Sequence, residues 1–220
     1  YPDWLSLTGD GYVSEMYKKY GRVVSPMGCR AFLSPWYEKG GMHPSDENDK
    51  PIFEGRFNLG VVSLNLPMIL AKSRKESKDF YEVLDYYLEL IRNHHKRTYD
   101  YIGELRASVN PVAFCQGGLY GGNLKPEEKI KSILPPMTMS YGITALNELQ
   151  RLYNGKSIRE DGEFALEVMK YINDYTNKIK EEDHILYAIY GTPAESLCGL
   201  QVEQFRKIYG LIEYVSDREY

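Results

Sequence analysis

The sequence predicts an α/β fold whose strands are mostly parallel neighbours. Helix-like and strand-like segments alternate from residue 57 to residue 215, which is the order of a parallel sheet with helical crossovers. The stretch 55–67, GRFNLGVVSLNLP, carries a nearly continuous apolar run, typical of a strand covered on both faces. A second run, ILYAIY at 185–190, leads through a Gly-Thr-Pro turn into a helix. Together these patterns predict strands buried between helices.

Composition limits the class of protein and of partner. The chain has 220 residues, of which 43% are hydrophobic, enough for one sizeable core. With 27 basic and 31 acidic side chains, the net charge of −4 favours neither nucleic acid nor an anionic membrane as partner. No apolar run reaches the roughly 20 residues that span a bilayer. Three cysteines without framework spacing favour a reducing cytoplasm.

The first candidate site is a loop at 25–36, SPMGCRAFLSPW, with Cys29 at its tip. Pro26 and Gly28 break regular structure before the thiol, which predicts a turn or loop. A lone thiol on a loop beside a buried strand is a candidate reactive centre. The competing interpretation is that Cys29 is a small buried hydrophobic residue, as most free cysteines are.

The segments on either side of this loop carry little apolar pattern. We expect a short helical turn at 16–20. Residues 37–54 are rich in Gly, Pro, Asp, Asn and Lys, so we expect an exposed insert in which His43 is solvated rather than catalytic.

A long helix follows, because apolar residues recur at intervals of three and four from Phe80 to Ile91 and more weakly to Leu105. His94 and His95 are adjacent, so on a helix they point about 100° apart and cannot share a metal ion. We interpret them as part of a polar helix face. The further elements predicted are a buried strand at 109–115, a short helix at 126–134, a short strand at 137–140, and helices at 142–153 and 160–181.

The last predicted strand ends in a turn that has two interpretations. Thr192-x-x-Glu195 matches a capping box with Pro193 at the first helical position, so these residues can simply start a helix running to about Tyr209. A helix N-terminus at the carboxyl end of a strand is also an anion site, at which Ala194 and Glu195 offer backbone N–H groups.

Five stretches carry a family resemblance, and they occur in that family's order along nearly all of the chain. The sequence resembles the anaerobic (class III) ribonucleoside-triphosphate reductases, which are glycyl-radical enzymes, and it is similar to an internal fragment of their large catalytic subunit. The stretches are PMGCRAFLSPW from Pro26, GRFNLGVVSLNLP from Gly55, GGLYGGNLKPEEKI from Gly117, TMSYGITALNEL from Thr138 and YGTPAESLC from Tyr190.

The resemblance implies a fold and a mechanism. The fold is part of the ten-stranded α/β barrel of that family, with an inner finger loop that carries Cys29. Cys29 corresponds to the cysteine that becomes a thiyl radical and abstracts the 3′-hydrogen of a ribonucleoside triphosphate. Asn58 corresponds to an asparagine that orients substrate and formate. Thr192, Ala194 and Glu195 correspond to the turn beside the substrate phosphates.

The resemblance also implies cofactors and partners. These are a glycyl radical formed by a radical-SAM activating enzyme, formate (or a thiol protein) as reductant, zinc, and ATP or dNTP effectors, in a homodimeric cytoplasmic enzyme that supplies deoxynucleotides anaerobically. The glycyl-radical segment and the zinc-binding cysteines have no counterpart here, and both ends lack start or stop signals. We therefore expect 1–220 to be one incomplete barrel fragment, inactive alone, whose final residues enter another strand.

Three alternative functions stay open from the residues. The first is another glycyl-radical enzyme of the pyruvate formate-lyase type. The second is a non-catalytic phosphate- or nucleotide-binding α/β module built on the Thr192 turn, which would bind nucleotide without Cys29. The third is a Cys–His hydrolase, which lacks a convincingly placed histidine.

Overall fold

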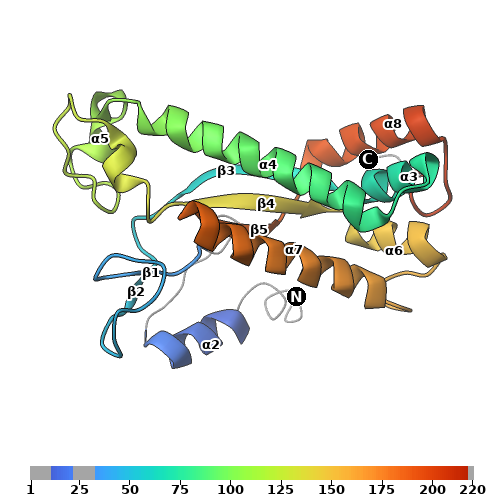
Figure 1. Cartoon of the computed structure of the whole chain (residues 1–220), viewed down its shortest axis with the longest axis horizontal. Coiled ribbons are helices and arrows are strands. Elements are labelled where there is room, and N and C mark those ends of the chain that lie inside the picture. Colours follow the sequence, from blue (N-terminus) through green and yellow to red (C-terminus); the bar gives the residue numbers. More distant parts are fainter. Residues whose placement is uncertain (1–10, 22–32, 218–220) are drawn as a thin grey trace.

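A three-stranded parallel sheet forms the centre of the fold. The structure, a computed structural model, describes residues 11–21 and 33–217. The strand order is β3 (Asn58–Asn65), β4 (Thr138–Thr144) and β5 (Leu186–Gly191), and both pairings are parallel. Helices α4 and α7 run along one face of this sheet, and α3, α6 and α8 gather at its carboxyl end (Figure 1). The predicted α/β fold with parallel neighbours is confirmed.

The remaining elements are short or lie at the periphery. A small antiparallel hairpin, β1–β2, lies near the amino end of the sheet, together with α5 (Figure 1). None of the described helices has the length and apolar character needed to cross a membrane. The bounds are α2 Gly11–Tyr20, β1 Trp36–Tyr37, β2 Pro51–Ile52, α3 Leu66–Glu76, α4 Phe80–Gly103, α5 Pro111–Phe114, α6 Leu146–Asn154, α7 Glu163–Asp183 and α8 Glu195–Tyr209, with 3₁₀ turns at Ala107–Val109 and Ile130–Ile133.

The main core lies between the sheet and helices α4 and α7. Alternate residues of each strand face this side, among them Met139, Tyr141 and Ile143 of β4. The apolar stripe predicted for α4 packs against them, with Leu84 and Leu88 completely buried. Burying these side chains is the main source of stability for the sheet–helix pair.

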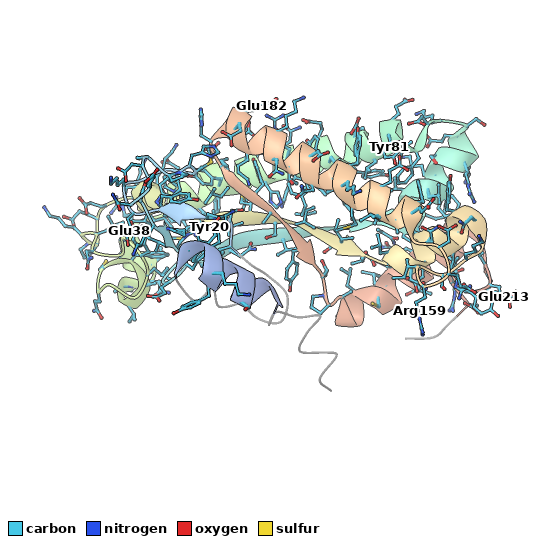
Figure 2. The ribbon with its side chains drawn as sticks, turned by 90° about the horizontal axis from the view of Figure 1, so that it is seen from below. Tyr20, Glu38, Tyr81, Arg159, Glu182 and Glu213 are labelled. Atoms are coloured by element: carbon cyan, nitrogen blue, oxygen red, sulfur yellow. The ribbon has the colours of Figure 1, made fainter. Side chains whose placement is uncertain are left out.

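Helices α4 and α7 are joined along their solvent side by a ladder of tyrosine–carboxylate hydrogen bonds. Because each pair is separated by 86 residues and successive pairs are four residues apart on both helices, the two helices run parallel in register. Figure 2 shows Tyr81 and Glu182 toward opposite ends of the pair. Tyr81 donates to Glu167 at 2.6 Å, Tyr171 to Asp85 at 2.8 Å and Tyr175 to Glu89 at 2.6 Å.

An ion-pair cluster around Asp183 lies at the end of α7, beyond the last of these tyrosine–carboxylate hydrogen bonds. Arg92 donates to both Asp183 carboxylate oxygens, at 2.8 and 2.7 Å, and Lys96 and Tyr187 donate to the same carboxylate at 2.9 and 3.1 Å. The Asp183 side chain is only 4% exposed. The hydrogen bonds from Arg92 hold the pKa of Asp183 at about 2, below its usual range. The cluster therefore ties the end of α7 to α4.

The prediction of a strand at 109–115 is wrong. These residues form a 3₁₀ turn and the short helix α5, because the Asn110 side chain caps the Ala113 N–H and Pro111 occupies the first helical position. Cys115, at the end of α5, is half-buried in a satellite cluster. Of the helix predicted at 126–134, only the 3₁₀ turn at 130–133 forms.

The boundary predicted between strand and helix near residue 142 is also wrong. The strand predicted at 137–140 continues through Thr144, and the helix predicted from Gly142 begins at Leu146. The change occurs at Ala145, whose φ of 56° lies in the left-handed region. The short turn predicted at 16–20 is part of the longer helix α2, and residues 211–217 form turns rather than the expected strand.

The prediction that both histidines lie on a polar helix face is wrong for His95. His94 is exposed, but His95 is only 1% exposed, packs edge-on against Tyr141, and has its Nε2 3.1 Å from the Ser140 carbonyl oxygen. The backbone carbonyl of β4 accepts from the neutral ring, so burial is tolerated without charge. Burial lowers the pKa of His95 to about 4.

We predict that the chain loses stability as the pH falls from 6.5 toward 4. In that window unfolded His95 binds a proton that the folded chain excludes, so the free energy of unfolding should drop by about 3 kcal/mol. The measurement is urea unfolding at pH 7, 6, 5 and 4. His95→Gln should flatten this slope, whereas His43→Gln, at an exposed position, should keep it. An unchanged slope in His95→Gln would assign the effect to other groups.

Candidate functional site

On the side of the sheet opposite the main core, the central strand β4 is polar, which is unusual for parallel strands, whereas β5 presents Leu186, Ala188 and Tyr190 there. On β4 every second residue is small or polar: Thr138, Ser140, Gly142 and Thr144, and the three with polar side chains are buried. Their register partners on β3 include Asn58 and Ser63. We call this surface the polar face. A row of hydroxyl and amide groups along a sheet can hydrogen-bond a polar ligand.

A β-bulge directs Asn58 onto the polar face. The β3–β4 register shifts between Asn58 and Gly60, so Asn58 pairs with Thr138 whereas Gly60 pairs with Met139. Without the extra residue, strict alternation would turn the Asn58 side chain toward the helices. The amide is held from both ends, since its Nδ2 donates to the Ser140 hydroxyl and its Oδ1 accepts from the Gly60 N–H at 2.9 Å.

Two hydroxyl groups meet across the central strand at the carboxyl end of the polar face. Ser63 Oγ of β3 lies 2.8 Å from Thr192 Oγ1, which follows β5. This contact passes over Gly142 of β4, where a Cβ atom would collide with both hydroxyl oxygens. Glycine is therefore required at residue 142 for the outer strands to share this hydrogen bond.

The turn after β5 departs from the predicted capping box. Helix α8 begins at Glu195, its N-cap residue is Ala194 at φ 66°, and no side chain caps it. The Thr192 hydroxyl bonds Ser63 instead, and its N–H donates to the Ile143 carbonyl at 3.2 Å. The N–H groups of Leu197 and Cys198 donate to the Ala194 carbonyl oxygen, whereas the N–H groups before them have no acceptor within the helix and lie at the carboxyl edge of the sheet.

A cavity of about 380 Å³ lies under this turn. Its volume falls within the range of small-molecule sites. The residues that line it include no lysine or arginine, and Glu148 is acidic. Any anion bound there would rely on hydroxyl groups and the positive end of α8. The polar lining comes from Asn65, Thr144, Glu148, Thr192, Cys198 and Gln201, beside Ala194 and apolar residues that include Ile189 and Phe205.

The structure brings some of the predicted site residues together. Thr192 and Ala194 line the cavity, and Glu195 starts α8 beside them. Asn58 lies on the same polar face but toward its other end, about 16 Å from Ser63 along the strand. Cys29 lies outside the described residues. The described chain holds no group of three or more His, Cys, Asp or Glu residues arranged for a metal ion.

Sequence reasoning missed Ser63, Ser140 and Gly142. The stretch 138–144, TMSYGIT, alternates small or polar residues with apolar ones, a period-two pattern that marks a strand with one polar face. That signal was obscured by the expectation that a helix starts at Gly142.

The model of the anaerobic ribonucleoside-triphosphate reductase family matches residues 1–220. The whole chain is 30% identical to the anaerobic ribonucleoside-triphosphate reductase of Haemophilus influenzae and 26% identical to that of Escherichia coli. Over 89% of its length it is 30% identical to that of Enterobacteria phage T4. The chain spans about 30% of the length of these relatives.

We predict that Gly142→Ala separates the two hydroxyl groups and destabilises the sheet. The added methyl group would meet Ser63 and Thr192 inside a packed strand, which should cost about 1–3 kcal/mol of unfolding free energy. Gly60→Ala is the matched control, since its Cβ would meet no atom within 4 Å. Urea unfolding of both variants tests this, and equal losses would show that residue 142 tolerates a side chain.

Proposed function

The chain belongs to the anaerobic ribonucleoside-triphosphate reductase family, and we propose that it is the part of a longer enzyme that reduces ribonucleoside triphosphates to 2′-deoxyribonucleoside triphosphates. The reaction would supply deoxynucleotides for DNA synthesis without oxygen. The observation that carries the proposal is the polar face, which runs from the amide of Asn58 to the cavity at the start of α8.

The two ends of the polar face suit different parts of a nucleotide. At the carboxyl end, the Thr192 hydroxyl and the backbone N–H groups at Ala194 and Glu195 would hold the phosphates, with the α8 dipole adding favourable charge. The ribose would then extend along the sheet toward Asn58. This is the usual place for a ligand in an open parallel sheet, outside the carboxyl ends of the strands.

Asn58 is suited to orient a neutral hydroxyl group or a small carboxylate. Ser140 and Gly60 occupy one donor and one acceptor site of its amide. An amide carries a second N–H and further lone pairs, and its charge does not change with pH. Asn58 can therefore donate to a ligand oxygen and accept from a ligand hydroxyl at the same time.

Cys29 would perform the hydrogen transfer. A glycyl radical, on a segment outside this chain, would supply the unpaired electron. The Cys29 sulfur atom gives up its hydrogen atom, takes the 3′-hydrogen of the ribose, and later returns a hydrogen atom to the same carbon. The 2′-hydroxyl would take up a proton and leave as water, and formate would supply the two electrons and the hydrogen that replaces the hydroxyl at the 2′-carbon, becoming carbon dioxide. Excluding water around these steps protects the intermediates.

The proposal places this chain within a ten-stranded α/β barrel. Strands β3 and β5 are both edge strands of the described sheet, and an unpaired parallel edge invites a further strand. A barrel would also enclose the polar face. We assign the activating enzyme, the homodimer contact, and the zinc and effector sites to other segments of the longer protein, so this chain alone should be inactive.

A non-catalytic nucleotide-binding module remains the second candidate. The cavity beside Thr192 and Ala194 favours it, because phosphate binding needs neither Cys29 nor Asn58. The two candidates differ in what a change at Cys29 does to turnover.

We predict that Cys29→Ser abolishes nucleotide reduction in the full-length enzyme. A serine O–H bond is too strong for reversible hydrogen-atom transfer, so turnover with formate should fall below detection under anaerobic conditions. Equilibrium dialysis should still show nucleotide binding, and electron paramagnetic resonance should still show the glycyl radical. Cys115→Ser, in the satellite cluster, is the control and should keep its activity. Turnover by Cys29→Ser would rule out the proposed thiyl chemistry.

We predict that Thr192→Val weakens substrate binding more than it slows the chemical step. Loss of one hydroxyl hydrogen bond to a charged phosphate should raise KM for the ribonucleoside triphosphate by roughly tenfold with little change in kcat. Thr192→Ser keeps the hydroxyl and should restore KM. If the valine and serine variants share the wild-type KM, the hydroxyl does not contact substrate.

A further inference from the structure

A buried arginine joins three backbone segments at the amino end of the sheet. Arg56 is 5% exposed. Its guanidinium group donates to the carbonyl oxygens of Ser34 at 2.7 Å, Ile52 at 2.7 Å and Pro136 at 2.5 Å. Guanidinium donors point in fixed directions within one plane, so the three bonds form together only while all three carbonyls keep their places.

The charge of Arg56 has no carboxylate partner among the described residues. Burial lowers the pKa of Arg56 to about 10, so the side chain still carries its charge at neutral pH. A buried charge that is held by carbonyl dipoles is often less stabilising than an apolar side chain of similar size. Stability alone therefore does not account for Arg56, which leaves the geometry of its contacts.

The β-bulge that follows Arg56 would be undone by a slip of one residue. Leu59 is the extra residue, because the residues on either side of it pair with consecutive residues of β4, Thr138 and Met139. In a ladder without the bulge, Leu59 would stand opposite Thr138, and Asn58 would pair one place earlier. Leu59 would then leave the core cluster that it packs against, and the Asn58 amide would turn toward the helices. The two registers thus place Asn58 on opposite faces of the sheet.

In the described chain, few contacts join the segments that lead into β3 and β4. The Phe57 carbonyl accepts from the Thr138 N–H at 3.2 Å, whereas the Phe57 N–H meets the sulfur atom of Met137 at 3.3 Å. Pro136 has no N–H to donate. The bond from Arg56 to the Pro136 carbonyl therefore adds a connection beyond these contacts. Undoing the bulge would slide residues 56–58 by about 3.3 Å and separate Arg56 from its three acceptors.

We propose that Arg56 is a positioning residue that keeps β3 in the bulged register and thereby holds the Asn58 amide on the polar face. The three carbonyls fix residue 56, and Ser140 and Gly60 bond the amide two residues later. The chemical consequence rests on the proposed function, but the geometry does not. In that function Asn58 would orient ribose or formate, and a displacement of about 1 Å between reacting groups can cost roughly 100-fold in rate.

The test compares Arg56→Lys and Arg56→Gln in the full-length enzyme. Lysine keeps the charge, but one ammonium group cannot reproduce the planar arrangement of three bonds. Arg56→Lys is also the milder change, and it carries the test if Arg56→Gln does not fold. Arg74→Gln is the matched control, because Arg74 also donates to two backbone carbonyls but at an exposed position on α3. The variants are compared at a temperature at which circular dichroism shows them fully folded.

The first readout is hydrogen–deuterium exchange at single residues by mass spectrometry, which needs no reductase activity. The reporter is the Gly60 amide, which donates to the Asn58 side-chain oxygen at 2.9 Å. We expect it to exchange roughly tenfold faster in both Arg56 variants, with the Thr192 amide at the carboxyl end of the sheet unchanged. Arg74→Gln should change neither rate. Unchanged Gly60 exchange in both Arg56 variants would overturn the inference.

A double variant separates the positioning of Asn58 from a general loosening of the strand. In Asn58→Ala the Gly60 amide loses its side-chain acceptor, so its exchange is already fast. If Arg56 acts through Asn58, adding Arg56→Lys leaves that rate unchanged. An acceleration as large as the one in the wild-type background would mean that Arg56 only stabilises the strand, and the inference would fail.

The last readout is the division between kcat and KM. We expect both Arg56 variants to lose about 100-fold in kcat, with KM for the nucleotide changed by no more than about twofold, because the phosphates would bind at the other end of the polar face. Wild-type kcat in folded variants would leave Arg56 with a structural role only. If the wild-type enzyme reduces no ribonucleotide while the exchange results hold, the proposed function fails but the positioning of Asn58 stands.

Discussion

Strand β4 lies between two parallel neighbours, and all seven of its residues are buried. Pairing on both edges satisfies its backbone, and strict alternation then assigns each side chain to one of two environments. Met139, Tyr141 and Ile143 enter the main core, whereas the residues between them form the polar face. A register slip of one residue would exchange the two sets, so the core and the candidate site are specified by the same pairing.

Two departures from regular strand geometry or packing bring polar side chains onto the polar face. The bulge before Gly60 turns Asn58 out of the core side, and the missing side chain at Gly142 lets Ser63 reach Thr192. Both features weaken regular sheet pairing or packing, and neither improves the core. The helix-covered side remains regular, with its α4–α7 ladder in constant register. The irregular features are therefore confined to the polar face, while the side covered by α4 and α7 keeps regular geometry.

The sequence allowed β3, β5 and the long helices to be predicted, because these strands are apolar runs and the apolar periods of the helices are strong. It failed where short-range chemistry competes with that pattern. The apolar run at 109–115 became a capped helix through Asn110, and the Thr192 capping box yielded to a tertiary hydrogen bond with Ser63. His95 could not be recognised as buried, since its acceptor, the Ser140 carbonyl, belongs to a distant strand. Motif order made Asn58 and Thr192 candidates but gave no indication of Ser140 and Ser63, which hydrogen-bond them.

The absence of lysine and arginine from the cavity lining bears on how a reductase would use it. Substrate and product of the proposed reaction carry the same triphosphate and differ by one ribose hydroxyl. Strong ion pairs to the phosphates would bind both equally, so they would slow product release without lowering the barrier. Hydroxyl groups and a helix N-terminus instead supply modest, directional stabilisation, on the order of 1 kcal/mol for the dipole. Discrimination is then left to the ribose end, where the amide of Asn58 is held in a fixed orientation by Ser140 and Gly60.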